Sequence, residues 1–259
     1  MSADYVADLA EKAGARVERG YYNNPQTGKG SSRSLVETIQ RLERTPVITE
    51  IKFASPSAGK IKEVQDPLNI AMEMLKGGAC AISVVTDPDD FHGNLDTLAT
   101  LSRAVDAPLI MKDIIVSPIQ IQAAARAGAR TVVLISELFS RGLTDAPLDM
   151  LVREANQLGV EVLLEANSPL EFGKLREHQP DLYGINNRNM STFTLDLSTT
   201  ERVLAMHYHV DRPVVSESGI EHARDIVRLK KAGANAFLVG TSIMKSSNIE
   251  SKVRELVNA

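Results

Sequence analysis

The chain has 259 residues, of which 43% are hydrophobic and 24% are charged, and its formal net charge is −4. This composition is typical of globular proteins, and the length suits either two small domains or one large α/β domain. The slight negative charge and the 4% of aromatic residues argue against a nucleic-acid partner, which usually requires basic surfaces and stacking side chains. No stretch approaches the roughly 20 apolar residues of a membrane span, so we expect no membrane partner.

The beginning of the chain and its single cysteine both predict a cytoplasmic location. The N-terminal stretch contains acidic residues and lacks the apolar core of a signal peptide. Cys80 alone excludes an intrachain disulfide and a multi-cysteine zinc site. Because it opens an apolar run, we expect it to be a small buried side chain.

Residues 1–45 predict an N-terminal helical extension that differs from the rest of the chain. A first helix is indicated by apolar residues at helical spacing, namely Ala7, Leu9, Ala10, Ala13 and Val17. Residues 21–30 are polar and rich in loop-forming residues, and Ser34 precedes a second short helical pattern.

From Pro46 onward, short apolar runs alternate with helical patterns. The runs have the length of buried strands and lie at Val47–Ile51, Ala81–Thr86, Leu109–Lys112, Thr131–Ser136, Val160–Glu165, Leu182–Asn186, Val214–Glu217 and Ala236–Gly240. Helical spacing is clearest in Pro67–Lys76, Pro118–Ala127, Leu148–Leu158 and Ile220–Ala232. Eight strand-then-helix units predict one (β/α)8 TIM barrel domain, over residues 1–259 with the extension included. An open doubly wound sheet is the alternative, but no Gly-x-Gly-x-x-Gly follows the first run.

Polar residues stand at the ends of several predicted strands, where the active sites of such barrels lie. Glu50 and Lys52 end the first strand and share its inward face, because residues two apart on a strand point the same way. A structural ion pair would also explain this pair on its own. Other strands end in Lys112, Glu165, Asn186 with Arg188, and Glu217. Buried charges that converge on one end of a barrel indicate a functional site.

The last two strand ends predict a phosphate site. Ser218-Gly219 and Gly240-Thr241 each lead from a strand toward a helix, and backbone N–H groups at helix N-termini bind anions. Glycines that merely allow tight turns are the alternative interpretation. No histidine ends a strand and no metal-ligand motif is present, so we expect lysine and glutamate chemistry without a metal ion or other cofactor.

The segment Pro46–Ser57, PVITEIKFASPS, closely resembles the first-strand signature of the indole-3-glycerol phosphate synthase family. Further matches follow in order at Ile82–Asp87, Lys112–Asp113, Gly184–Asn189, Ser216–Ile220 and Val239–Met244. The resemblance implies a small phosphorylated substrate, 1-(2-carboxyphenylamino)-1-deoxyribulose 5-phosphate. In this family the aryl carbon bearing the carboxylate attacks the ribulose carbonyl, after which carbon dioxide and water leave.

The resemblance also implies a role for each strand-end residue. It makes Lys112 the general acid and Glu165 the general base, with Lys52 assisting dehydration and contacting phosphate, and Glu50 holding the lysines. The remaining roles are substrate contacts. Ser55 and Pro56 would line the anthranilate pocket, Asn186 and Arg188 would orient the sugar hydroxyls and the carboxylate, Glu217 and Ser218 would contact the ribulose chain, and Ser218, Gly219, Gly240 and Thr241 would bind the phosphate.

The chain departs from the family pattern at three places without losing a proton-transfer group, one of them the unusual segment Ser136-Glu137-Leu138-Phe139 after the fourth strand. Ile114 stands where an aromatic residue is common, and Ala166-Asn167 stand where Val-His is common. Two other functions remain open. One is a phosphoribosylanthranilate isomerase, which needs a Cys/Asp pair, although Cys80 lies at a strand start. The other is a phosphate-ligand binding barrel without catalysis.

Overall fold

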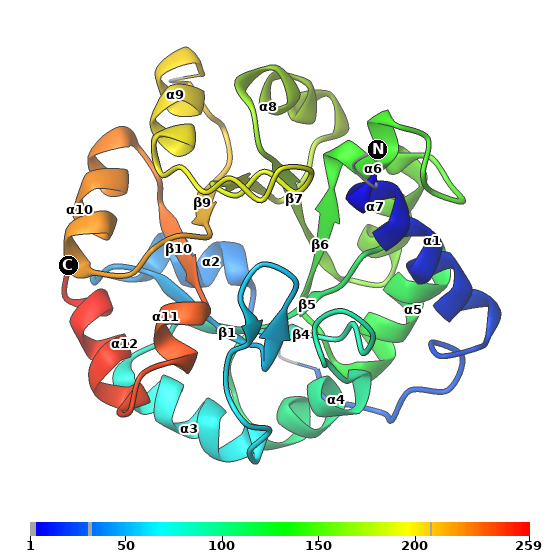
Figure 1. Ribbon diagram of the computed structural model, residues 1–259, viewed down its shortest axis with the longest axis horizontal. Helices are drawn as coiled ribbons and strands as arrows, with labels where there is room; N and C mark the ends of the chain where they lie inside the picture. Colours follow the sequence, from blue (N-terminus) through cyan, green and yellow to red (C-terminus); the bar gives the residue numbers. More distant parts are fainter. Residues whose placement is uncertain (1–3, 31–32, 208) are drawn as a thin grey trace.

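The computed structural model describes residues 4–30, 33–207 and 209–259. In this part of the chain eight parallel strands close into a barrel with helices around it (Figure 1). The strands follow one another around the barrel in chain order, and β10 (Ala236–Val239) returns to pair with β1 (Val47–Ile51). The predicted barrel is therefore confirmed, and the open sheet is excluded.

The remaining elements alternate as the sequence pattern predicts. The other barrel strands are β4 (Ala81–Val85), β5 (Leu109–Lys112), β6 (Thr131–Ile135), β7 (Glu161–Ala166), β8 (Leu182–Asn186) and β9 (Val214–Glu217). The helices are α1 (Tyr5–Glu18), α2 (Leu35–Arg41), α3 (Pro67–Gly77), α4 (Leu95–Ala104), α5 (Pro118–Ala127), α6 (Ser136–Ser140), α7 (Leu148–Gln157), α8 (Pro169–Leu175), α9 (Ser198–Met206), α10 (Ala223–Ala232), α11 (Thr241–Met244) and α12 (Ile249–Val257), with a 3-10 turn at Arg176–His178.

Two local features differ from the sequence prediction. A two-stranded hairpin, β2 (Ala54–Ser55) and β3 (Gly59–Lys60), stands between β1 and α3. Helix α10 begins at Ala223 rather than at Ile220, because Ser218 and Gly219 have φ angles of 67° and 81° and turn the chain before the helix starts. The two residues predicted to bind phosphate after β9 therefore lie in a loop.

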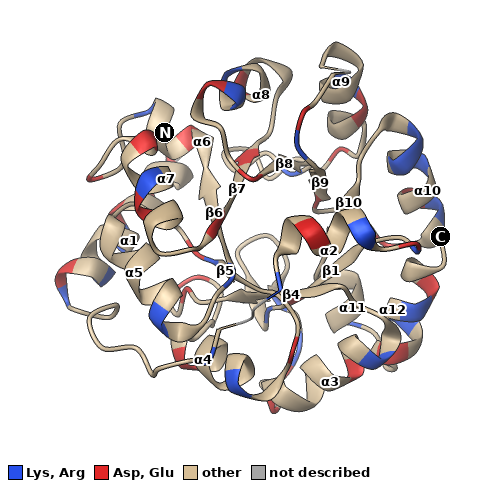
Figure 2. Ribbon diagram, turned by 180° about the vertical axis from the view of Figure 1, so that it is seen from behind, with Lys and Arg blue, Asp and Glu red and all other residues tan. Residues whose placement is uncertain are grey.

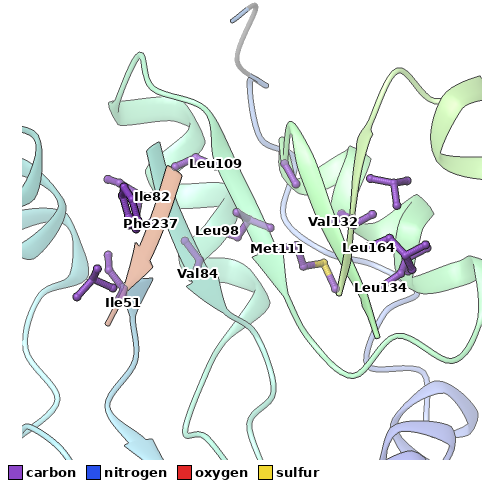
Figure 3. Close-up of a cluster of buried hydrophobic side chains, with 14 of the residues drawn as sticks. Ile51, Ile82, Val84, Leu98, Leu109, Met111, Val132, Leu134, Leu164 and Phe237 are labelled. Carbon is purple, nitrogen blue, oxygen red and sulfur yellow. The ribbon is translucent and has the colours of Figure 1, made fainter. Parts of the chain in front are cut away.

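The hydrophobic core has an outer and an inner part. The outer part fills the space between strands and helices, where Ile51, Val84 and Met111 are almost fully buried (Figure 3). The inner part fills the barrel interior near the amino ends of the strands. Several strands contribute to it, with residues such as Ile110 and Leu163. Ile51 thus faces outward, as predicted, and its neighbours Glu50 and Lys52 face the barrel axis.

The two N-terminal helices lie at opposite ends of the barrel. Helix α2 covers the end of the barrel at which the strands begin, which we call the floor. There Leu35 and Ile39 join the inner core (Figure 2). Helix α1 packs Val6, Leu9 and Ala13 against residues that follow β5 and β6. Ala7, which we expected on the buried face, is only half-buried, because the neighbouring Val6 takes that place.

The helix boundaries follow local sequence signals. The Ser34 side chain accepts a hydrogen bond from the Glu37 backbone N–H at the start of α2. Gly78, Gly128 and Gly233 end α3, α5 and α10 with positive φ angles, as the repeated glycines predict. None of the helices in the described ranges has the length and apolar character that crossing a bilayer requires.

Candidate active site

A cavity of about 220 Å³ lies at the carboxyl ends of the barrel strands. Every residue that the sequence assigned to the site lines this cavity: Glu50, Lys52, Ser55, Pro56, Lys112, Glu165, Asn186, Arg188, Glu217, Ser218, Gly219, Gly240 and Thr241. The cavity therefore brings together residues from six strand ends and from the β2–β3 hairpin.

Lys112 lies at the centre of the charged groups. Its Nζ is 2.9 Å from Glu165 Oε2 and 3.1 Å from Glu217 Oε2. Both carboxylates are buried, whereas the lysine side chain is 22% exposed, toward the cavity. Burial by itself lowers the pKa of Lys112, but the charges of Glu165 and Glu217 outweigh it, so the pKa is raised. The ammonium group therefore stays protonated near neutral pH.

Glu217 is a closer partner of Lys112 than the sequence suggested, since we had assigned it only to the substrate's ribulose chain. Burial raises the pKa of Glu217 to about 7; Lys112 opposes this shift, and the charge of Glu165 adds to it. Among the described residues, no group donates a hydrogen bond to its second oxygen, Oε1. One oxygen of this buried carboxylate thus lies without a hydrogen-bond donor next to Gly184.

A second ion pair joins the two charged residues at the end of β1. Lys52 Nζ lies 2.5 Å from Glu50 Oε1, and the Glu50 side chain is only 3% exposed. The structure therefore pairs Glu50 directly with Lys52, and the charge of Glu50 also helps to raise the pKa of Lys112. The two ammonium groups each have their own carboxylate partners, which offsets the repulsion between them.

Two glycines make room for the buried carboxylates. A Cβ atom on Gly184 would lie 2.7 Å from Glu217 Oε1, and one on Gly240 would lie 2.5 Å from Glu50 Oε1. Gly240 is also one of the residues that we expect to bind the phosphate. The contact with Glu50 gives this glycine a second constraint, because a larger residue at position 240 would displace Glu50.

Asn186 and Arg188 follow each other along the inner face of β8 and the loop after it. The Asn186 side-chain amide donates to Glu165 Oε1 at 2.7 Å, so both oxygens of Glu165 are held. Asn186 Oδ1 accepts from the Arg188 backbone N–H at 2.9 Å, and the Arg188 guanidinium donates to the Phe193 carbonyl at 3.1 Å. This chain of hydrogen bonds fixes Glu165 and Arg188 relative to each other.

The loops after β9 and β10 line one side of the cavity. The Ser242 hydroxyl donates to the Ile220 carbonyl at 2.9 Å and so ties the two loops together. Gly240 precedes the four-residue helix α11, whose first residue is Thr241. Only the second of the two predicted strand-to-helix steps is direct, since Ser218 and Gly219 are separated from α10.

An apolar wall that the sequence did not predict closes the opposite side. It consists of Tyr5, Leu9, Phe91, Ile114 and Phe193, whereas Leu195 lies against Gly219. Tyr5 of α1 and Phe193 of the loop after β8 contact each other, with ring centroids 4.7 Å apart. Leu9 had the expected helical spacing, but the pairing of Tyr5 with Phe193 spans most of the chain and leaves no local signal.

Cys80 lies away from this cavity. It is buried at the floor, beside Leu35 and Ile39, and burial raises the pKa of its thiol to about 12. Its position confirms the prediction of a small buried side chain and gives no support to a Cys/Asp acid–base pair. Within the described ranges there is no group of three or more His, Cys, Asp or Glu residues arranged to hold a metal ion.

Comparisons with known proteins agree with this geometry. The family model "Indole-3-glycerol phosphate synthase" matches residues 5–256. The chain is 41% identical over 220 residues to the indole-3-glycerol phosphate synthase of Rhodopirellula baltica. The aligned residues cover 85% of this chain and 83% of that protein. The enzyme of the same name from Sulfurimonas denitrificans is 37% identical over 231 residues, covering 87% and 86% of the two chains.

Among solved structures, an N-acetylmannosamine-6-phosphate 2-epimerase from Clostridium perfringens superposes with a TM-score of 0.64 at 12% identity, over 83% of this chain and 93% of that chain. This likeness concerns the fold alone. The family model and the relatives extend over nearly the whole barrel and the cavity residues. The chain therefore belongs to the indole-3-glycerol phosphate synthase family.

Proposed function

We propose that this chain closes the indole ring of indole-3-glycerol phosphate from 1-(2-carboxyphenylamino)-1-deoxyribulose 5-phosphate, with loss of carbon dioxide and water. The observation that supports this best is the Lys112 ammonium group, held between two buried carboxylates in a cavity with an apolar wall. Ring closure needs these parts: a proton donor, a proton acceptor, and an apolar surface for the aryl ring.

Lys112 serves as the general acid of the first step. The aryl carbon that bears the carboxylate forms a bond to the ribulose carbonyl carbon, and the carbonyl oxygen takes a proton from Lys112. Loss of carbon dioxide then returns its bonding electrons to the ring. Glu165 and Glu217 keep the ammonium group charged and aimed into the cavity, so no rearrangement is needed when the oxygen becomes negative.

Glu165 and Lys52 serve in the loss of water that follows. The hydroxyl group formed in the first step leaves with a proton from Lys52, and Glu165 accepts the proton from carbon. Glu50 holds Lys52 in place through their ion pair. Asn186 holds the Glu165 carboxylate from the side opposite Lys112, so that the base stays fixed during both steps.

The remaining cavity residues orient the substrate. Ser55 and Pro56 of the β2–β3 hairpin bound the aryl pocket, and Asn186 and Arg188 orient the sugar hydroxyls and the aryl carboxylate. Glu217 and Ser218 contact the ribulose chain. The phosphate lies on Ser218, Gly219, Gly240 and Thr241, with Lys52 adding positive charge.

A fluorescence assay tests the proposed activity directly. The chain contains no tryptophan, so an indole formed from the carboxyphenylamino substrate is seen without a protein background. We expect indole fluorescence to grow with time and enzyme concentration. The dephosphorylated substrate serves as the matched control and should have a much lower kcat/KM. Absence of product from the phosphorylated substrate would disprove the proposal and leave a binding barrel.

We also propose that the enzyme works in the cytoplasm as one domain, with residues 1–45 as its helical extension, and that it binds neither membranes nor nucleic acid. The net charge of −4 and the single buried cysteine support these statements. Fractionation of cells of the source organism tests the location. Recovery of the protein with membranes or with nucleic acid would contradict it.

A further inference from the structure

A buried arginine of the N-terminal helix lies behind the cavity. Arg16 of α1 is 0% exposed, and its guanidinium group is surrounded by carboxylates. One nitrogen lies 2.9 Å from Asp87 Oδ2 and 3.4 Å from Asp113 Oδ1, and another lies 3.1 Å from Asp89 Oδ2. Asp87 and Asp113 also line the cavity. The extension thus reaches the active-site wall with a charged group.

Asp113 is the residue that connects Arg16 to the proposed general acid, because it directly follows Lys112. Its Oδ2 accepts hydrogen bonds from the Tyr22 hydroxyl at 3.0 Å and from the Thr86 hydroxyl at 2.6 Å. Tyr22 in turn accepts from Arg16 Nε at 3.3 Å. The Asp113 carboxylate is therefore held from the extension and from the end of β4 together.

The backbone on either side of Lys112 is fixed by the same groups. The Thr86 N–H donates to the Lys112 carbonyl at 3.1 Å, and the Asp113 carboxylate accepts from the Ile114 N–H at 2.8 Å. Because the ends of β4 and β5 are joined here, a shift of Asp113 moves the backbone from which the Lys112 side chain extends. An error of about 1 Å in such a position is known to slow catalysis by about 100-fold.

A purely structural role would not require a buried arginine surrounded by carboxylates. Buried ion pairs cost desolvation free energy, and apolar residues of similar volume usually stabilise a fold as well. Arg16 stands instead among carboxylates at the back wall of the site. We propose that Arg16 is a positioning residue of the reaction: through Asp113 it fixes the end of β5 and thereby the ammonium group of Lys112. This inference rests on the activity proposed above.

The sharpest test removes the guanidinium group and then supplies it from solution. Arg16→Ala should lower kcat by about 10- to 100-fold, with little change in KM, because Arg16 contacts none of the residues proposed to bind the substrate. Millimolar guanidinium chloride should restore part of the lost kcat, and sodium chloride at the same ionic strength should not. All rates are expressed per folded molecule, measured by near-ultraviolet circular dichroism.

Two further variants control for a loss of folding. Arg19→Ala removes a neighbouring arginine of the same chain segment, which is 53% exposed and pairs with Asp89, and it should leave kcat unchanged. Tyr22→Phe keeps the buried ring and removes only the hydroxyl group that, beside the direct Arg16–Asp113 contact, bridges these two residues. If Arg16→Ala does not fold, a lower kcat of Tyr22→Phe at unchanged KM supports the proposal.

The outcomes separate this inference from the proposed activity. If the unmodified enzyme forms no indole product, the activity itself is wrong. If it is active and folded Arg16→Ala has the same kcat, the positioning role is wrong. The positioning role is also wrong if guanidinium does not restore the lost kcat or if only KM increases. Where Arg16→Ala does not fold, a fully active Tyr22→Phe would overturn it.

Discussion

Glu217 contacts Lys112 through only one of its two oxygens. Oε2 lies 3.1 Å from the Lys112 ammonium, while Oε1 has no hydrogen-bond donor among the residues described. The folded protein therefore holds this carboxyl group in a less favourable environment for the charged form than water does. Its pKa of about 7 expresses this cost.

This cost predicts how stability depends on pH. Unfolded, Glu217 loses its proton near pH 4.5, but the folded protein keeps that proton until about pH 7. Since the folded state binds the proton more tightly, the free energy of unfolding falls as pH rises between these values. From pH 5 to pH 8, the free energy of unfolding of the unmodified protein should fall relative to that of Glu217→Gln.

Urea denaturation of both proteins at several pH values measures this difference. Asp113, whose pKa burial raises to about 6, titrates in both proteins and cancels in the comparison. Parallel stability curves for the two proteins would contradict the assignment.

Replacing Lys112 should separate chemistry from binding. Lys112→Met removes the proposed proton donor, so kcat should fall by about 10²- to 10⁴-fold, while KM changes much less. The melting temperature should also fall, because Glu165 and Glu217 lose their cation. Lys60→Met is the matched control, since Lys60 is 61% exposed and pairs with Glu63. Steady-state kinetics measure both variants. If the kcat of Lys112→Met is close to that of the unmodified enzyme, the acid role moves to Lys52.

A negative charge on the loop after β10 should weaken phosphate binding. Thr241→Asp places a carboxylate at the first residue of α11, on the cavity wall, without the contact with Glu50 that a substitution of Gly240 would cause. The new carboxylate would repel the phosphate, and about 1.4 kcal/mol of repulsion weakens binding tenfold. We therefore expect KM to rise by about tenfold or more. Ser251→Asp adds the same charge near the start of α12, outside the cavity, and should leave KM unchanged. Equal KM values for the two variants would place the phosphate elsewhere.

A stability variant tests how the floor helix is anchored. Glu161 of β7 is buried, and its carboxylate accepts hydrogen bonds from the Leu35 backbone N–H at 2.8 Å and from Thr131 at 3.2 Å. Glu161→Ala leaves these donors unpaired and should lower the free energy of unfolding by about 1–3 kcal/mol per lost partner group. The exposed Glu37→Ala serves as control. The kcat of folded Glu161→Ala should match that of the unmodified enzyme; a large loss would show that the floor influences the site.

The sequence predicts those parts of the site that follow from strand geometry. Glu50, Lys52 and Lys112 stand at strand ends, and a closed parallel barrel brings all strand ends to one face. Their convergence therefore needs no information beyond the alternation of strands and helices and the inward direction of every second residue.

Contacts between distant segments are not encoded in such patterns. Arg16 lies on the same helix face as Leu9 and Ala13, but its charge gives no local reason for burial, and its partner Asp113 is 97 residues away. The Tyr5–Phe193 contact depends on where α1 comes to rest. The contact between Gly240 and Glu50 is hidden for the same reason, because the atom that needs the space belongs to another strand.

The placement of α1 and α2 at opposite ends of the barrel has a consequence for synthesis on the ribosome. Both helices emerge first, but the carboxylate that anchors Leu35 is made 126 residues later. Arg16 likewise waits for Asp113, and Gly28, between the helices, donates to the carbonyl of Arg126 at 2.8 Å. Until the middle strands exist, the apolar faces of the two helices have no surface to cover. The part of the enzyme that is translated first can therefore dock only after the chain has been made as far as Glu161.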